Sequence, residues 1–430
     1  YENFETWAEF YTLSDFNQVP KLEYRVLVRE PRAGTVPSEK QFPPLTKKDT
    51  IYAANADFTA KKFKKALFGT QYRSMWTTPV HVPIINLEEK LGGLLPIKKG
   101  GGMSSNSLRM RQIGGEKQFI LRSVKKDYSK LVGAKYKDLK ALDIARDQNS
   151  ASHPYASLAL PTLSKAANIY YTTPELVYLK HQKGLGNYNS QFPEELYLLE
   201  QRPTGDWSDA EQFGNSKKII GYTDLLEKLR TKKNHSVDQN WVLKSRIFDL
   251  WIHDWDRHDD QWRWASFKKG EQTLYRPIPR DRDQVFYKFE GLIPTVVAAF
   301  FVKKFKTMKA DVKDVKNLSF NARYFDRYFL NALEWKDWER AIDTLQIALT
   351  DEVIKQAMQD IPKEVQAFDN PEIIRMLKSR RDKLKPIARK LYDFLSKEVE
   401  IVGTDNKDYF EIQRNQNGSV LVKHFIKSKS

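Results

Sequence analysis

The feature that most constrains this chain is a run of acidic and tryptophan residues, followed by a second run of acids and arginines. The first run is Asp249-Leu-Trp-Ile-His-Asp-Trp-Asp-Arg-His-Asp-Asp-Gln-Trp-Arg-Trp264, and the second ends in Pro277-Ile-Pro-Arg-Asp-Arg-Asp-Gln-Val-Phe286. Four of the ten tryptophans lie in the first run. Apolar rings beside ionisable groups shift carboxylate pKa values, so chemistry is expected here.

The spacing of the polar residues in these runs is that of a phosphotransfer site. Gln261 follows Asp256 by five residues, and Asp281 comes after a short predicted hairpin. In protein kinases a catalytic-loop Asp accepts the proton of the substrate hydroxyl, while an amide and a second Asp hold metal ions. The spacing therefore predicts Asp256 as the base, with Gln261 and Asp281 as metal ligands. Neighbouring residues complete the predicted site. Arg257 and His258 are predicted catalytic residues, and Asp283 is a predicted metal ligand.

These motifs carry a resemblance to known kinases. Asp-Arg-His-x-x-Gln from Asp256, followed by Ile-Pro-Arg-Asp-x-Asp-x-x-Phe ending at Phe286, resembles the Asp-Arg-x-x-x-Asn and Asp-Asn-Gly-x-x-Phe pair of type II phosphatidylinositol 4-kinases and secretory-pathway kinases. The resemblance implies ATP and Mg²⁺ or Mn²⁺ as cofactors. Gln261 stands where the family has Asn, and no Gly follows Asp281. A longer amide displaces the metal, so we expect slow or undetectable turnover, and whether the chain is an enzyme stays open.

A glycine run precedes the acids by about a third of the chain. Gly100, Gly101 and Gly102 are followed by Ser104 and Ser105. Glycines let backbone N–H groups approach a phosphate without a Cβ in the way, so this segment is predicted to contact nucleotide phosphates. Taken alone, a glycine triplet is also typical of a flexible turn.

A predicted strand after the glycines carries the cation that would neutralise phosphate charge. Arg122 is aligned with the kinase strand lysine, and Lys125 is the alternative. A kinase also needs an acid on the following helix to pair with that cation, and residues 137–150 are predicted to be helical. Asp147 and Asp143 are the candidates, although both could equally be solvated charges on a helix face.

The order of elements predicts an α+β chain with a two-lobed protein-kinase-like fold, in which a strand-rich N-lobe precedes a helical C-lobe. We expect four segments: 1–50 as a β segment and linker that could end a preceding domain, 51–203 as the N-lobe, 204–400 as the C-lobe, and 401–430 as a β-hairpin tail. Asp238 is predicted to cap a helix over 239–255. Further helices are expected at 292–305, 325–349, 351–358 and 371–399. An antiparallel pair is expected at 174–179 and 195–203, and a hairpin turned at Asn417-Gly418 near the end.

The chain is also similar to a module of large Gram-negative envelope proteins, where it lies between a calcineurin-like metallophosphoesterase domain and a surface-antigen outer-membrane β-barrel. The matching pieces are Gly100-Gly-Gly-x-x-x-Asn-Ser-Leu-Arg, Phe119-Ile-Leu-Arg-Ser-Val-Lys-Lys-Asp127, Ser152-His-Pro-Tyr155, Phe213-Gly-Asn-Ser-Lys-Lys218, Asp254-Trp-Asp-Arg-His258 and Pro277-Ile-Pro-Arg-Asp-Arg-Asp-Gln284. This resemblance implies a place on the periplasmic face or the surface of the outer membrane, beside an outer-membrane protein or barrel domain. Such a compartment is poor in ATP, which favours a binding module.

Composition limits the partners and the chemistry. The net charge of +17 suits an anionic partner such as nucleotide phosphate or anionic envelope components, but it is also what a soluble basic surface shows. Nucleic acid is not the expected partner. The chain has no Cys, which excludes disulfides, thiol catalysis and Cys-bound zinc. No signal peptide is recognised, and the longest apolar run is too short to span a bilayer.

Three explanations of the acid cluster compete. The first is the kinase-like site, active or inactive. The second is a two-metal phosphodiesterase that would use Asp254, Asp256, His258, Asp281 and Asp283. The third is a buried structural network in which the acids pair with Arg257, Arg263, Arg280 and Arg282. An inactive kinase-like chain would serve as a scaffold or interaction module.

Overall fold

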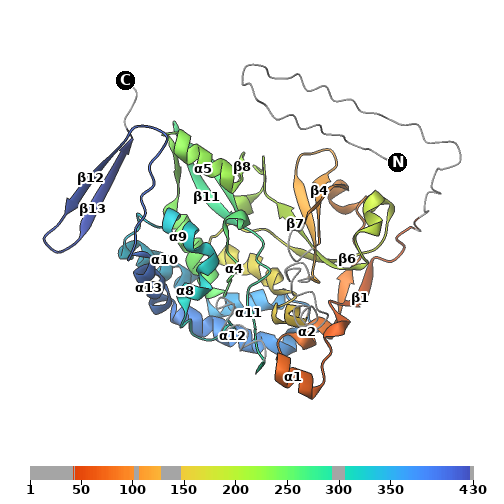
Figure 1. Ribbon diagram of the computed structural model, residues 1–430. Coiled ribbons are helices and arrows are strands. Elements are labelled where there is room, and N and C mark those ends of the chain that lie inside the picture. The colour runs from red at the N-terminus through yellow and green to blue at the C-terminus, as the bar shows by residue number, and fades with distance from the viewer. Residues whose placement is uncertain (1–41, 43, 101–105, 127–146, 293–305, 427–430) are drawn as a thin grey trace, which may run out of the picture. The chain divides into compact units, whose positions relative to one another are not determined.

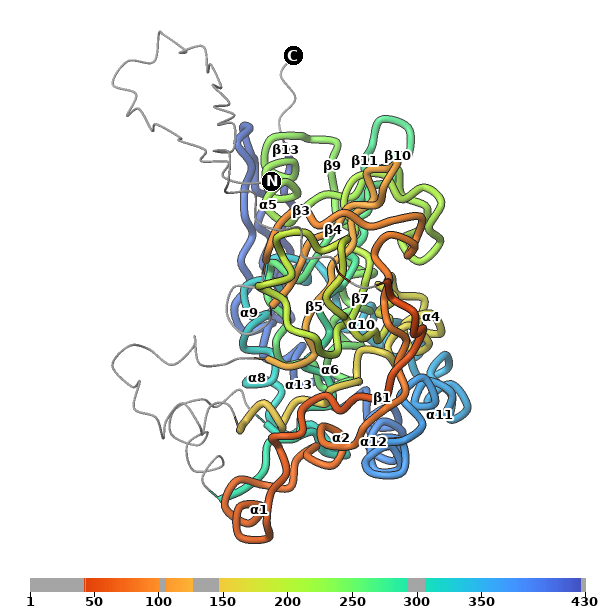
Figure 2. Tube along the Cα trace, turned by 90° about the vertical axis from the view of Figure 1, so that its right-hand side faces the viewer, coloured from red at the N-terminus to blue at the C-terminus, as the bar shows by residue number. Residues whose placement is uncertain are grey.

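The structure is a computed structural model that describes residues 42, 44–100, 106–126, 147–292 and 306–426. Its contacts divide the chain into two units, 1–44 and 45–430. The second unit mixes helices and strands, as the α+β prediction requires. Within it, the strands of the two larger sheets gather at one end and helices α10 to α13 at the other (Figures 1 and 2). The finer four-segment division stays a prediction.

The larger sheet has five antiparallel strands in the order β3-β4-β5-β7-β6. Their bounds are β3 (Leu94–Gly100), β4 (Ser107–Gln112), β5 (Gln118–Ser123), β6 (Glu175–Leu179) and β7 (Glu195–Arg202). The predicted antiparallel pair is confirmed, with Leu176 opposite Leu198. Side chains alternate across the sheet because a strand has a period of two. Leu108 and Leu121 enter one core, whereas Arg122 lies on the opposite face.

The second sheet positions the acids. It consists of β8 (Ile219–Ile220), β10 (Trp262–Lys269), β11 (Gln272–Pro279) and β9 (His235–Val237), in that order. Strands β10 and β11 form the predicted hairpin, with Trp262 opposite Pro279 at its open end. Gln261 immediately precedes β10, and the Arg280 N–H donates to its carbonyl oxygen over 3.0 Å. The hairpin therefore brings the end of the first acidic run to the start of the second.

Helix α6 (Gln239–Trp251) delivers the first run to this place. The predicted cap is confirmed, because the side chain of Asp238 accepts a hydrogen bond from the Trp241 N–H over 3.1 Å. The helix ends four residues before the predicted Trp255. His253 has a left-handed backbone with φ +61°, which a right-handed helix cannot continue through. Asp254 and Asp256 consequently lie in a loop.

Helices α10, α12 and α13 pack against α6, and two of the predicted long helices are broken. Residues 325–349 form α9 (Arg323–Phe329) and α10 (Trp335–Ala348), and 371–399 form α12 (Gln366–Asp382) and α13 (Leu384–Leu395). The break before α10 has a local cause, since the Glu334 N–H donates to the Asp337 carboxylate over 2.9 Å and starts a new helix. Predicted helix 292–305 falls almost entirely outside the described residues. The other elements are β1 (Asp49–Ala53), α1 (Lys62–Phe68), α2 (Arg73–Thr77), β2 (Pro79–Pro83), α4 (Leu160–Ala166), α5 (Tyr222–Thr231), α8 (Val315–Leu318) and α11 (Asp351–Gln359).

Two hydrophobic cores meet at the larger sheet. One includes α6 and the helices against it, with Trp251, Trp262 and Trp264 fully buried. The other covers the opposite face of the sheet. The tryptophans of the first acidic run are therefore largely core residues. In the part of the chain that the structure describes, no helix has the length and apolarity needed to cross a membrane.

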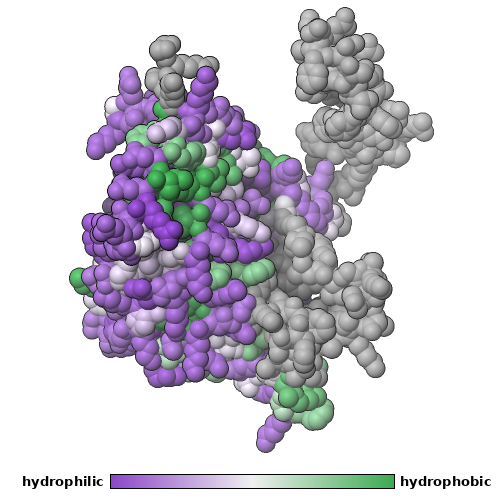
Figure 3. Space-filling view, turned by 60° about the vertical axis from the view of Figure 1, so that its left-hand side comes forward, coloured by the Kyte–Doolittle hydropathy of each residue, from purple (hydrophilic) through white to green (hydrophobic). Residues whose placement is uncertain are grey.

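The chain ends in the predicted hairpin, formed by β12 (Asp408–Arg414) and β13 (Val420–Ile426). Gly418 has φ +84° in its turn, a conformation that glycine adopts freely. The hairpin is a sheet of its own and stands clear of the other strands in Figure 1. Several of its apolar side chains are exposed, including Ile412 at 69%. Figure 3, in which the left-hand side of Figure 1 comes forward, shows a compact hydrophobic patch on a mostly hydrophilic face.

Candidate functional site

An ion pair joins the larger sheet to the second acidic run. Arg122 lies on β5, the central strand of its sheet, and its Nη1 is 3.0 Å from the Asp281 carboxylate. Its Nη2 is 3.3 Å from Oε1 of Glu200 on β7. The structure thus places the predicted strand cation directly against the predicted Mg²⁺ ligand.

The backbone at Asp281 is in a sparsely populated conformation. Asp281 has φ +59° and Phe286 has φ +57°, so left-handed residues bracket the segment that follows β11. Such conformations cost free energy in residues other than glycine and are concentrated at functional sites. Phe286 is fully buried, and its N–H donates to the Ile252 carbonyl oxygen just after α6. The segment is therefore held from both ends.

Electrostatics keep Asp281 ionised. Burial by itself would raise the pKa of Asp281, but the positive charges of Arg122 and Arg280 outweigh it and lower that pKa below its ordinary value. Burial also raises the pKa of Glu200, which Arg122 only partly offsets. Asp281 is thus a charged carboxylate at neutral pH, as a metal ligand must be.

The predicted base is held by a residue that the sequence did not indicate. Asp256 is partly exposed, and its Oδ1 accepts a hydrogen bond from Nδ2 of Asn321 over 2.8 Å. Its own N–H donates to Oδ1 of Asp254 over 3.2 Å. Asn321 lies between α8 and α9, far along the chain from the acidic runs. The sequence around Asn321 gives no signal of this role, because it has the pattern of an ordinary turn.

Gln261 has a buried side-chain oxygen without a hydrogen-bond partner among the described residues. The residue is 3% exposed, and the oxygen is its Oε1. Its carbonyl oxygen, by contrast, accepts from Arg257 Nη2 over 3.1 Å and from the backbone of Arg280. An unsatisfied buried oxygen is uncommon and points to a water or an ion. Amide and carboxylate oxygens are the ligands that Mg²⁺ takes, so Gln261 and Asp281 fit such an ion in kind.

The two-metal phosphodiesterase explanation loses its support. Asp254, Asp256, His258, Asp281 and Asp283 all lie among the described residues, and within those residues no three His, Cys, Asp or Glu side chains come close enough to hold a metal ion. His258 is exposed, and its carbonyl oxygen starts the turn that ends at Gln261. Asp283 pairs with Lys126, whose Nζ is 2.7 Å from its carboxylate. Asp254, Asp281 and Asp283 each pair with a different cation.

The buried-network explanation is correct for two of its four arginines. Asp249, at the end of α6, is fully buried and faces Arg246 at 3.0 Å, Arg282 at 2.7 Å and Arg257 at 3.5 Å. Arg257 also donates to the Arg280 carbonyl oxygen over 2.7 Å and stacks on Trp262, so it braces the loop rather than facing a substrate. Burial raises the pKa of Asp254 to about 7.

The other two arginines do not pair with acids as expected. Arg263 donates to the carbonyl oxygen of its neighbour Trp262 over 2.9 Å, and Arg280 donates to the carbonyl oxygen of Asp260 over 3.1 Å. The acids that the sequence offered them are already taken by Arg122, Arg257 and Arg282. Their guanidinium groups are therefore left facing backbone oxygens.

Asp147, one of the two expected partners of Arg122, is bound elsewhere. Asp147 is bound by Arg73 on α2, at 2.9 Å, and by Lys64 on α1, at 2.8 Å. These cations and their hydrogen bonds lower the pKa of Asp147 against the effect of burial. Asp143 lies outside the described residues. Lys125, the alternative cation, points to Asp57 at 3.4 Å near the surface, so Arg122 holds the central place.

The glycine segment is described only at its start. Gly100 ends β3 and lies opposite Ser107 on β4. Gly101, Gly102, Ser104 and Ser105 lie outside the described residues, so their predicted contact with phosphate stays a prediction.

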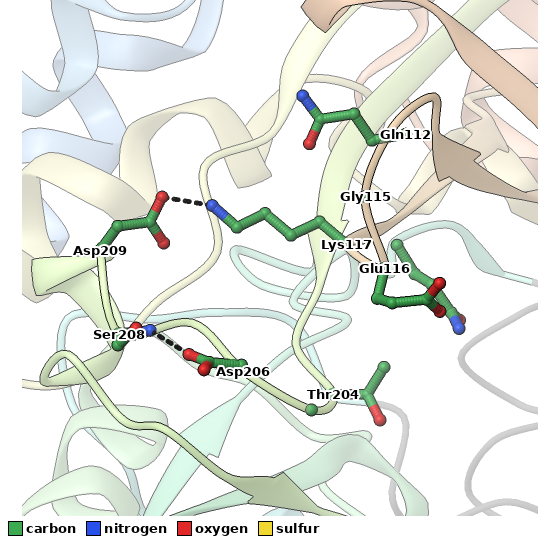
Figure 4. A pocket seen from close by; sticks show the side chains of 10 residues that line it. Gln112, Gly115, Glu116, Lys117, Thr204, Asp206, Ser208 and Asp209 are labelled. Carbon is green, nitrogen blue, oxygen red and sulfur yellow. Dashed lines mark hydrogen bonds and ion pairs between the residues drawn. The ribbon is translucent and has the colours of Figure 1, made fainter.

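Two small cavities flank the Arg122–Asp281 pair. Each has a volume of about 20 Å³, which suits a single water. One is lined by Glu200 and Arg280 among others, and the second by Arg122, Lys126 and Asp283 among others. A larger cavity of about 530 Å³ lies elsewhere, between the β4–β5 turn and the loop after β7 (Figure 4). There Lys117 reaches across to the Asp209 carboxylate.

Comparison with known proteins gives only distant similarity. No family model matches the chain, and no curated protein matches it. Among solved structures, a Helicobacter pylori proinflammatory kinase, CtkA, matches with a TM-score of 0.34 and 10% identity, over 67% of this chain and 95% of that chain. A Shewanella oneidensis toxin–antitoxin complex of HipA, HipB and operator DNA matches with a TM-score of 0.33 and 13% identity, over 71% of this chain and 68% of that chain.

Proposed function

We propose that this protein is a kinase-like module that binds a nucleotide together with Mg²⁺ or Mn²⁺, and that its phosphotransfer is slow or undetectable. The contact between Arg122 and Asp281 carries the proposal. It joins a strand cation to an ionised acid 159 residues further along the chain, in the segment whose Arg280 N–H donates to the Gln261 carbonyl oxygen. A phosphate-binding cation beside a metal-binding acid is the core of a phosphotransfer site.

The roles of the residues follow from their positions. Asp281 and Gln261 would hold the ion, which supplies neutralisation of phosphate charge. Arg122 would bind phosphate oxygens while Glu200 keeps its guanidinium in place. Asp256, fixed by Asn321, would orient an acceptor hydroxyl. Arg257 positions the loop through Asp249 and the carbonyl oxygens of Gln261 and Arg280.

The same contact explains why turnover would be slow. Arg122 and Asp281 neutralise each other at 3.0 Å, so each must exchange its partner before phosphate and metal can bind. The separation of a partly buried charge pair costs free energy, which reduces the affinity for both. Gln261 in place of Asn moves the amide oxygen further from its backbone, and catalysis of this kind depends on positioning.

The test is nucleotide binding with and without metal. We expect ATP with Mn²⁺ or Mg²⁺ to raise the midpoint of thermal unfolding of the parent, and Asp281→Asn to remove this rise while the protein stays folded. An amide attracts the cation far less than a carboxylate does. Asp209→Asn, an exposed acid on another surface, is the matched control. A variant Asp281→Asn that binds ATP and metal as tightly as the parent would contradict the proposal.

A second candidate function is a scaffold that binds protein partners. It is favoured by the exposed apolar side chains of the β12–β13 hairpin. We propose an envelope location and an outer-membrane protein or barrel domain as the partner, on the basis of the sequence resemblance alone. Labelling of an envelope extract by radioactive ATP with Mn²⁺, lost in Asp256→Ala, would favour the enzyme over the scaffold. Equal labelling by both proteins would favour the scaffold.

A further inference from the structure

One face of the larger sheet carries arginines that its acids do not match. Arg109 on β4, Ile120 on β5 and Glu200 on β7 lie side by side in register, so their side chains share a face. Arg202 lies two residues beyond Glu200 on the same face, and its Nη1 donates to Oε1 of Gln118 over 2.9 Å. Glu200 is already occupied by Arg122.

The β10–β11 hairpin adds two more arginines. Nη1 of Arg263 and Nη2 of Arg280 both donate to the carbonyl oxygen of Asp260, over 3.4 Å and 3.1 Å. Their guanidinium groups are therefore neighbours. Arg280 and Glu200 line one small cavity, so the hairpin arginines meet the arginine-bearing face of the sheet. We call Arg109, Arg202, Arg263 and Arg280 the arginine face.

The arginine face lacks ion pairs within the described residues, although Asp281, Glu200 and Asp260 lie near enough to act on the charge of Arg280. Among the residues that the structure describes, no carboxylate oxygen lies within 4.0 Å of any of its four guanidinium groups. Nε of Arg280 is buried without a hydrogen-bond partner. All four side chains are only partly buried, so they can be reached from solvent. A half-buried guanidinium group normally pairs with an acid. These four neighbouring groups have no such pair, so part of their hydrogen-bonding capacity is unused.

The arginines of this face repel one another, and for two of them burial and this repulsion together lower the pKa. Burial, reinforced by Arg109 and Arg280, lowers the pKa of Arg202 to about 10. Burial, reinforced by Arg280 and Arg202, lowers the pKa of Arg263 to about 9. Both groups remain charged at neutral pH, so the repulsion is present in the working protein.

We propose that the arginine face is a binding site for a ligand that carries two or more phosphate groups. Guanidinium groups bind phosphate through paired hydrogen bonds, and several phosphates would supply the charge that the protein does not. The site requires neither Asp281 nor a metal ion, so it goes beyond the proposed nucleotide–metal site and stands independently of it. The phosphates could belong to a nucleotide or to a lipid headgroup, which share this chemistry.

The first test is calorimetric titration with inorganic tripolyphosphate in low salt without metal. The double variant R202Q/R263Q is expected to bind about tenfold more weakly or worse, since each lost bond to a charged group has a sizeable effect on binding. R340Q/R375Q removes the same charge from exposed arginines of other helices, and it is the matched control. Equal weakening in both double variants would overturn the proposal, because binding would then follow net charge alone.

A second variant keeps the proposal testable if the first one misfolds. Arg109 donates no hydrogen bond among the described residues, so R109Q removes charge without breaking a bond that holds the fold. Without ligand, R109Q is expected to unfold at a higher temperature than the parent, because repulsion is relieved. Tripolyphosphate should then raise the unfolding temperature of the parent more than that of R109Q. An equal rise in both proteins would overturn the proposal.

Two further titrations distinguish a nucleotide from a lipid as the source of the phosphates. They also distinguish the arginine face from the proposed nucleotide–metal site. ATP without metal and vesicles containing phosphatidylinositol bisphosphate each support the site if binding is lost in R202Q/R263Q, and they distinguish nucleotide from lipid. Tripolyphosphate binding that is unchanged in R202Q/R263Q, together with ATP–Mg²⁺ binding that requires Asp281, would overturn the arginine face and leave the nucleotide proposal standing. Tripolyphosphate binding lost in R202Q/R263Q, with no effect of Asp281→Asn on ATP and Mg²⁺, would do the reverse.

Discussion

Two groups of arginines lie close together in this protein and differ in what balances their charge. Around Asp249, the buried side chains of Arg246, Arg257 and Arg282 each reach a carboxylate. On the arginine face, the guanidinium groups of Arg202, Arg263 and Arg280 donate to amide and carbonyl oxygens, and Arg109 donates no hydrogen bond among the described residues. The first group stabilises the loop that follows α6. The second costs stability in the free protein, which is what a site prepared for an anionic ligand is expected to do.

The largest expected effect comes from removing the centre of the balanced group. Asp249→Ala should lower the free energy of unfolding by about 3–5 kcal/mol, because three buried guanidinium groups would lose a shared carboxylate. Urea unfolding followed by circular dichroism measures this. The exposed pair of Arg389 and Asp393 provides the control, since Asp393→Ala should change stability by less than about 1 kcal/mol. Similar small losses in both variants would remove the distinction between buried network and surface.

An intermediate effect concerns the pH dependence of the same network. The pKa of Asp254 is raised to about 7 in the folded protein, chiefly by burial, above the ordinary value of an unfolded chain. Between the unfolded value and about 7, the folded state binds the extra proton, so Asp254 lowers stability as pH rises through this window. Asp254→Asn should abolish this decline, which is on the order of 3 kcal/mol between pH 4.5 and 7. Unfolding free energies measured from pH 4.5 to 7.5 test it, and an unchanged slope in the variant would contradict the assignment.

The smallest expected effect is on the unbalanced group. Arg263→Gln should leave the free energy of unfolding unchanged or raise it by roughly 0.5 kcal/mol, because a half-buried charge repelled by its neighbours is removed. Arg282→Gln, in the balanced group, is the matched comparison and should be destabilising, since Arg282 lies 2.7 Å from Asp249. Equal losses in the two variants, measured by urea unfolding, would mean that the arginine face also has a structural role.

Local signals in the sequence determined much of the fold. Asp238 ahead of α6, the Asn417-Gly418 turn and the alternation in β4 and β5 each act within a few residues, so their physical causes are present in the sequence itself. The spacing from Asp256 to Asp281 likewise predicted that the two acidic runs would meet, because a hairpin returns the chain to its starting point. The helix ends were predicted less well, since His253 and Glu334 interrupt helices through backbone conformation and capping that an apolar pattern does not show.

Only the tertiary structure decided which charges pair. With 72 basic and 55 acidic residues, the sequence offers many partners for every acid, and the energies of alternative ion pairs differ little before burial is known. Asp147 was expected beside Arg122 but lies against Arg73 and Lys64, while Arg122 reaches Asp281 and Glu200. The register of the sheet and the packing of α2 set these distances. The residue types of a charged site could therefore be predicted from the sequence, but its pairing, and the arginines left without acids, follow from distances that only the folded chain creates.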